Sequence, residues 1–223
     1  STNKKISILH NYFSSNEDLE NAWTIYLLIG KNNKRFLSGS SLKDLFSEIY
    51  EYPLWLIDSC YLKVGDSAEV ISLLLRNKII EKNKIFQDIS LNEFLKKSIP
   101  ELLVLKEDDR KLKVKEIWEN NPKENHLIIN KILTGTFRVG VSIGIITKSI
   151  AKLINLDEAI ISHRLMGDFF PSYESYKLLI NKRINPSELN YKPFPFLLAN
   201  PFEKKIIKES INNFQFEWKW DGI

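Results

Sequence analysis

Apolar residues recur every three or four positions through the first two thirds of the chain, which is the spacing of one helix face. The clearest stripe begins at Asp18 and ends at Gly30. No alternating run appears before about residue 190, and no repeat of fixed period is present. The pattern predicts an all-α domain with its helices packed in irregular layers. Further helices are expected at 42–50 behind the caps Ser40 and Ser41, at 53–64 between Pro53 and Gly65, from Asp66-Ser67 to Leu75, behind Ser90, at 111–121, at 125–133 and from Ser142 onward.

The pattern changes near residue 184. Four of the eight prolines lie between 186 and 201, a density that excludes a continuous helix and indicates an extended linker. A short helix over 203–212 and a strand over 214–220, with strict apolar/polar alternation, are expected after it. We therefore divide the chain into a helical domain, 1–184, and a proline-rich segment, 185–223, that ends in the first strand of a truncated second domain.

Composition narrows the possibilities further. The 223 residues contain one cysteine, Cys60, which excludes an intramolecular disulfide framework and a multi-cysteine metal site. No apolar run is long enough to span a bilayer, and we expect a cytoplasmic protein without a membrane partner or a metal site of its own. The net charge of +4 is modest, so a polyanionic partner has to be inferred from local charge.

A basic, glycine-rich stretch is the first candidate for chemistry. Three of the eight glycines lie in 135–144, and no acidic residue occurs in 125–156. Glycine permits a close backbone approach to a ligand, and Ser142 is expected to begin a helix whose first amides are free to bind an anion. Lys148 and Lys152 would share a helix face away from the apolar residues. The stretch indicates either a phosphate-contacting surface or a glycine-kinked helical hairpin with ordinary surface lysines.

Two other stretches are weaker candidates. His163, Arg164 and Asp168 suggest acid–base chemistry but form no complete nucleophilic or metal constellation. The simpler interpretation is a helix that ends at Gly167, with Arg164 and Asp168 forming a local pair. A further hypothesis is an independent enzyme that uses His163, Arg164 and Asp168. Lys219, flanked by carboxylates on an edge strand, would by itself be a surface lysine.

The motifs together resemble a known family. EWKWDGI, residues 217–223, resembles the KxDG motif of ATP-dependent DNA ligases. LTGTFRVGVS, residues 133–142, resembles the signature of the helical DNA-binding domain that precedes the ligase catalytic core. HRLMGD, residues 163–168, and YKPFPFLLANP, residues 191–201, are similar to segments of bacterial ligases associated with a large helicase-like protein. The resemblance runs in order from about residue 18 to residue 223.

The resemblance implies that residues 1–184 bind nicked duplex DNA through the sugar-phosphate backbone across the minor groove. Such contacts bind DNA regardless of its base sequence, and their affinity falls as the salt concentration rises. It also implies a helicase or nuclease of the same repair system as a partner, and we expect a monomer. The expected DNA contacts are Thr136, Arg138, Gly140 and Ser142 from the matching motif, with Lys131 and Lys148 added from charge and spacing.

In the resemblance, Lys219 is the lysine that attacks ATP and carries AMP, with Glu217 near the adenine and Mg²⁺ or Mn²⁺ as the metal of the full-length enzyme. The later nucleotide and metal motifs and the OB-fold of that family do not follow Lys219 here. Since a lysine nucleophile needs phosphate-binding cations and a metal, we predict that these 223 residues neither ligate DNA nor adenylate themselves. Intact-mass analysis after incubation with ATP and Mg²⁺ checks this, and an AMP adduct on Lys219 would contradict it.

A second class of function remains open at this point. A helical protein-interaction scaffold could use the same basic surface to dock an acidic partner protein. Such a surface should present exposed apolar anchors, whereas a phosphate-binding surface should present backbone amides and cations. Titration with nicked duplex at two salt concentrations distinguishes the two.

Overall fold

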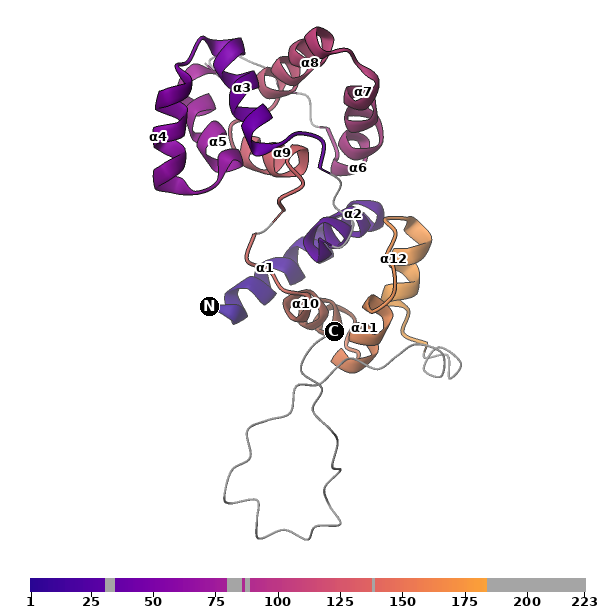
Figure 1. The fold of residues 1–223 in the computed structure, drawn as a ribbon. Helices are drawn as coiled ribbons and strands as arrows, with labels where there is room; N and C mark the ends of the chain where they lie inside the picture. The colour runs from indigo at the N-terminus through magenta and orange to yellow at the C-terminus, as the bar shows by residue number, and fades with distance from the viewer. Residues whose placement is uncertain (31–34, 80–85, 87–88, 138, 184–223) are drawn as a thin grey trace, which may run out of the picture. The chain divides into compact units, whose positions relative to one another are not determined.

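The computed structural model describes residues 1–30, 35–79, 86, 89–137 and 139–183, and within these ranges every regular element is a helix (Figure 1). The all-α prediction is therefore confirmed. The expected helix over 203–212 and strand over 214–220 lie outside the described residues. The elements are α1 (Thr2–Ser15), α2 (Asp18–Ile29), α3 (Gly39–Tyr50), α4 (Leu54–Val64), α5 (Ser67–Lys78), α6 (Leu91–Glu93), a π-helical turn (Phe94–Ser98), α7 (Ile99–Val104), α8 (Glu107–Asn120), α9 (His126–Leu133), α10 (Ile143–Ile154), α11 (Glu158–Leu165) and α12 (Tyr173–Ile180).

Local signals set most of the helix ends. α2 and α4 stop at Gly30 and Gly65, which adopt φ of 70° and 79°, a left-handed conformation that glycine reaches without a Cβ penalty. The Asp66 side chain caps α5 by accepting the Glu69 amide. One expectation is wrong: α3 is capped by Ser38, which accepts the Ser41 amide, so the helix starts earlier than the pair Ser40 and Ser41 suggests.

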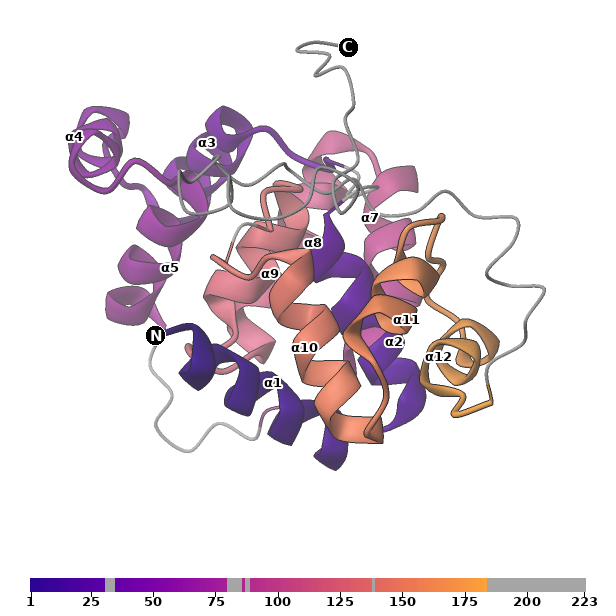
Figure 2. The same ribbon diagram turned by 90° about the horizontal axis from the view of Figure 1, so that it is seen from below.

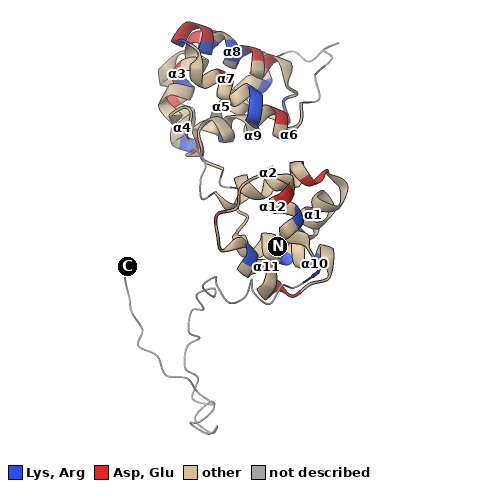
Figure 3. Cartoon of the chain, turned by 90° about the vertical axis from the view of Figure 1, so that its right-hand side faces the viewer, with Lys and Arg blue, Asp and Glu red and all other residues tan. Residues whose placement is uncertain are grey.

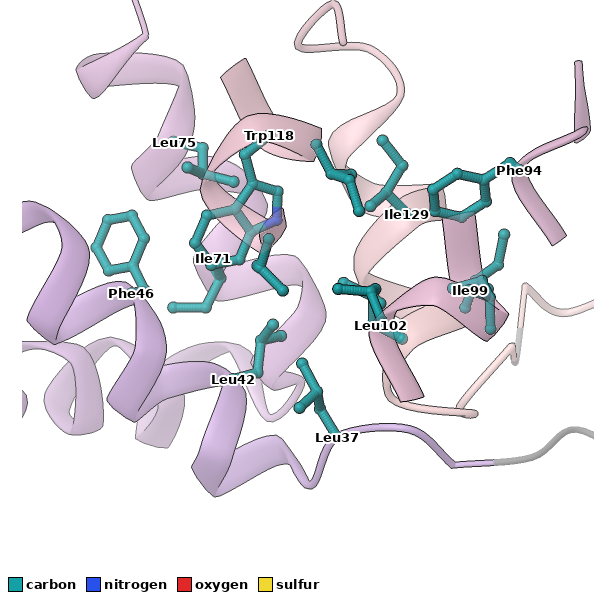
Figure 4. Packing of buried hydrophobic residues seen from close by; sticks show 14 of the residues in the cluster. Leu37, Leu42, Phe46, Ile71, Leu75, Phe94, Ile99, Leu102, Trp118 and Ile129 are labelled. Carbon is teal, nitrogen blue, oxygen red and sulfur yellow. The ribbon is translucent and has the colours of Figure 1, made fainter. Parts of the chain in front are cut away.

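The middle of the chain builds one hydrophobic core. Trp118 of α8 is fully buried, and its indole lies against the rings of Phe46 and Tyr50 from α3. Leu42, Ile71 and other apolar side chains of α3, α5, α7 and α9 complete the cluster (Figure 4). Burial of these large side chains supplies the main driving force for folding of this part.

A second core joins the two ends of the described chain. Phe13 of α1, Ile25 of α2, Ile146 and Ile150 of α10 and Tyr176 of α12 are all buried in it. α1 lies alongside α10, as Figure 2 shows. The sequence patterns did not reveal α1 or α12, so this long-range pairing is a finding of the structure. It places α1 beside the helix that follows the glycine-rich stretch.

Helix α2 contacts the N-terminal end of α6 through polar groups. The two carboxylate oxygens of Glu20 accept the amides of Leu91 and Asn92 at 2.8 and 3.0 Å, and the Trp23 indole donates to the Asn92 side chain at 2.9 Å. A carboxylate at a helix N-terminus satisfies amides that have no intrahelical partner. This cap fixes α6 to α2, the helix that contributes buried side chains to both cores.

Candidate nucleic-acid interface

The glycine-rich stretch forms the connection between α9 and α10. Its start is held in place because the Leu133 carbonyl accepts the amides of Phe36 and Leu37 at 3.0 and 2.9 Å. The Thr134 hydroxyl donates to the Asn130 carbonyl at 2.8 Å and lies 2.8 Å from the Thr136 hydroxyl. The connection therefore begins at the end of α9, which these hydrogen bonds hold in place.

Two glycines allow the chain to turn here. Gly135 and Gly140 have φ of 62° and 68°, in the left-handed region that other residues enter only at a cost of about 1 kcal/mol or more. Thr136, Gly140 and Ser142 are exposed. We call residues 134–142 the glycine turn. Three of its predicted DNA-contacting residues thus lie on the surface.

The glycine turn leads into the N-terminus of α10, where backbone donors are free. The Ser142 carbonyl accepts the amides of Ile145 and Ile146, but its side chain forms no capping bond. Among the described residues, the amides of Ile143 and Gly144 have no hydrogen-bond acceptor. Free amides and the positive end of the helix dipole together favour an anion at this position. The predicted helix start at Ser142 is confirmed.

The glycine turn also borders an open hollow of about 860 Å³. The other wall of the hollow is the C-terminal end of α2, residues 28–30. Val139 and Ile143 are 42% and 39% exposed, so Ile143 is not part of the buried face of α10 that holds Ile146 and Ile150, although its spacing from them is that of one helix face. The surface around the turn therefore combines backbone amides with a few apolar side chains.

Two exposed lysines lie on α10, the helix that follows the glycine turn. Lys148 and Lys152 of α10 are exposed, while Ile146 and Ile150 on the other face of the helix are buried. The predicted separation of the two faces is thereby confirmed. Figure 3 shows basic residues on α1 and α10, and acidic residues together with basic ones on α8.

Lys131 is not on the surface, and its expected role as a DNA contact is corrected by this placement. The residue is 6% exposed, and its ammonium binds the Asp66 carboxylate at 2.5 Å. Partial burial raises the pKa of the Asp66 carboxyl, but hydrogen bonds from Lys131 and the amides of Glu69 and Ala68 outweigh it, so the pKa lies below its usual value. The charge of Lys131 is therefore compensated inside the protein by Asp66.

The remaining predicted site residues lie outside the described residues. They are Arg138, in the middle of the glycine turn, and Glu217 and Lys219 in the C-terminal segment. Their roles stay predictions that rest on the resemblance.

The stretch around His163 has the architecture of a helix end. The guanidinium of Arg164 donates to the carbonyls of Leu179, Asn181 and Arg183 at 2.9, 2.6 and 3.1 Å, and so satisfies the C-terminal end of α12. His163 is 4% exposed. In the part of the chain that the structure describes, no group of three His, Cys, Asp or Glu residues is placed to hold a metal ion. These contacts favour the structural interpretation of this stretch.

One residue at the glycine turn has no signal in the sequence. The Lys5 ammonium, from α1, donates a hydrogen bond to the Gly140 carbonyl at 2.6 Å. The two residues are 135 positions apart, and residues 1–17 carry no pattern that links them to the turn. Only the packing of α1 on α10 reveals the contact.

Comparison with known proteins places these features in a family. The structure defines an all-α domain that presents the glycine turn and free helix amides on its surface. Residues 1–151 match the family model described as DNA ligase N terminus, and because this is well over half of the chain, the chain belongs to that family. A search of the curated proteins finds no match. The resemblance to the N-terminal domain of DNA ligases is therefore confirmed, and DNA is the partner that family membership implies. No described helix is long and apolar enough to cross a membrane.

Proposed function

We propose that this chain is the DNA-engaging portion of an ATP-dependent DNA ligase, and that the glycine turn and the start of α10 bind the sugar-phosphate backbone of nicked duplex across its minor groove. The observation that carries the proposal is the exposed turn with free amides, which lies within the residues that match the family. A ligase has to act at any nick, and backbone amides with a few cations bind phosphate without reading bases.

The charge pattern agrees with this proposal. Residues 125–156 contain no carboxylate that would repel phosphate, and Lys148 and Lys152 are exposed on α10. The apolar side chains of Val139 and Ile143 would face deoxyribose instead of water in a minor-groove contact. ATP and Mg²⁺ for the parent enzyme, Lys219 as its AMP carrier and a helicase or nuclease partner are further proposals that rest on the resemblance.

The alternative function is protein docking, and it has its own observation. Trp55 and Leu62 of α4 are 70% and 82% exposed, which is unusual for large apolar side chains on one helix. This surface lies on α4, outside the basic stretch. Docking through the basic stretch itself is distinguished from DNA binding by titration with nicked duplex, because binding that is absent or insensitive to salt would contradict the DNA proposal.

The Arg138→Ala variant is expected to weaken binding of nicked duplex about five- to tenfold at 0.15 M salt, equally for all DNA sequences. Loss of one phosphate contact should also reduce the slope of log K against log salt by about one. Fluorescence anisotropy at several salt concentrations with two unrelated duplexes measures both quantities.

Arg76→Ala is the matched control for this experiment. Arg76 is an exposed arginine of α5, so its removal changes the net charge equally but leaves the glycine turn intact. We expect its affinity and salt slope to stay close to those of the wild type. A sequence-selective loss in Arg138→Ala, or an equal loss in both variants, would argue against a phosphate contact at the turn.

A further inference from the structure

Helix α1 forms one side of the support on which the proposed DNA site rests. It packs along α10, with Phe13 buried in the shared core and the Ser149 hydroxyl within 3.4 Å of the Ile6 carbonyl. The N-terminal part of α1 therefore has a defined position beside the glycine turn. Lys5 is the residue of α1 that contacts it.

The ammonium of Lys5 sits directly on Gly140. It donates to the Gly140 carbonyl at 2.6 Å, and a Cβ atom placed on Gly140 would lie 3.2 Å from Lys5 Nζ. One hydrogen bond to a neutral carbonyl uses one of the three ammonium N–H groups and leaves the charge uncompensated. Lys5 is exposed, and it forms no ion pair with any acidic residue that the structure describes.

The same hydrogen bond orients the backbone of the turn. In a trans peptide the carbonyl and the following N–H point in opposite directions. With the Gly140 carbonyl held toward Lys5, the Val141 N–H points away from α1, and it has no acceptor among the described residues. Lys5 thus combines a free positive charge with a fixed orientation of the Gly140–Val141 peptide.

We propose that Lys5 is a phosphate-binding residue of this DNA site, contributed by α1 from outside the glycine turn. The inference rests on the proposed function, since the phosphate is that of the bound duplex. A phosphate oxygen next to Gly140 would accept one of the remaining N–H groups of Lys5 in a charge-assisted hydrogen bond. The contact adds affinity without sequence preference, as a nick-binding surface requires.

Lys5→Gln is the decisive variant, because it removes the charge and keeps a polar N–H donor of similar, slightly shorter reach. We expect it to weaken binding of labelled nicked duplex about five- to tenfold at 0.15 M salt and to lower the salt slope by about one. Lys5→Arg should bind like the wild type. Lys4→Gln, at the neighbouring exposed lysine of the same helix, is the matched control and should lose much less affinity.

The outcomes separate this inference from the proposed function. If the wild type binds nicked duplex with the expected salt dependence but Lys5→Gln keeps its affinity and slope, Lys5 only positions the turn and the inference is wrong. An equal loss in Lys4→Gln would also overturn it, because the effect would then follow net charge alone. If the wild type does not bind, the proposed function itself fails. Thermal unfolding of each variant verifies that the fold is retained.

Discussion

Replacing Asp66 with asparagine is expected to lower the free energy of unfolding by about 2 to 3 kcal/mol, because the ammonium of Lys131 would remain buried without its counterion. Lys131 is 6% exposed, and its Nζ lies 2.5 Å from the Asp66 carboxylate. Asparagine can still cap α5 by accepting the Glu69 amide, so the variant removes the charge and preserves the helix start. Urea unfolding at pH 7, followed by circular dichroism, measures the change.

The same ion pair predicts how stability depends on pH. The pKa of Asp66 is lower in the folded protein than its usual value of 3.8, so the folded state binds this proton less readily than the unfolded state. Its contribution is fully present above pH 3.8 and is lost as the pH falls through the lower folded-state pKa. Since other carboxylates also titrate in this range, the effect of Asp66 is measured as the difference in the free energy of unfolding between wild type and Asp66→Asn. We expect this difference to shrink as the pH falls below about 4.

Asp58→Asn provides the control for the measurement of stability at pH 7. Asp58 pairs with Lys43, but its side chain is 54% exposed, so water screens the interaction. We expect a loss below about 1 kcal/mol. An equal loss of stability in Asp58→Asn and Asp66→Asn would show that burial of Lys131 does not strengthen its ion pair with Asp66.

Replacing Trp118 with alanine is expected to cost about 3 to 5 kcal/mol, and more if the polar network around it is disturbed. The indole is fully buried, its ring centroid lies 6.2 Å from that of Phe46, and its N–H donates to the Asn130 side chain at 2.8 Å. Asn130 in turn donates to the Ser72 hydroxyl at 3.0 Å. The variant therefore creates a large cavity and leaves a buried amide oxygen without its donor.

Trp55→Ala is the matched control, since it removes the same side chain from α4, where Trp55 is 70% exposed. We expect a change within about 0.5 kcal/mol. Chemical denaturation monitored by far-UV circular dichroism avoids dependence on tryptophan fluorescence, which both substitutions alter. A Trp118→Ala protein as stable as Trp55→Ala would contradict the described core.

Part of the fold could be predicted because its causes lie within a few residues of one another. Gly30 and Gly65 end their helices through their own backbone conformation, and Asp66 caps the helix that it precedes. The π-helical turn over 94–98 was not predicted, since the Ser90 cap fixes where a helix begins but not how its later hydrogen bonds pair. Helix α1 was not predicted either, because the burial of its apolar side chains depends on packing against α10, which is remote in sequence.

In the candidate site, too, some features follow from local sequence and others depend on packing. The sequence by itself determined the all-α class, the position of the glycine turn and the acid-free stretch around it, since composition and local backbone preference set these features. Only the tertiary structure decided which lysines lie exposed beside the glycine turn. Lys131 is paired with Asp66, 65 positions away, and Lys5 contacts Gly140 across 135 positions. Whether a lysine faces a phosphate or an internal carboxylate depends on burial and on partners remote in sequence, and packing alone supplies both.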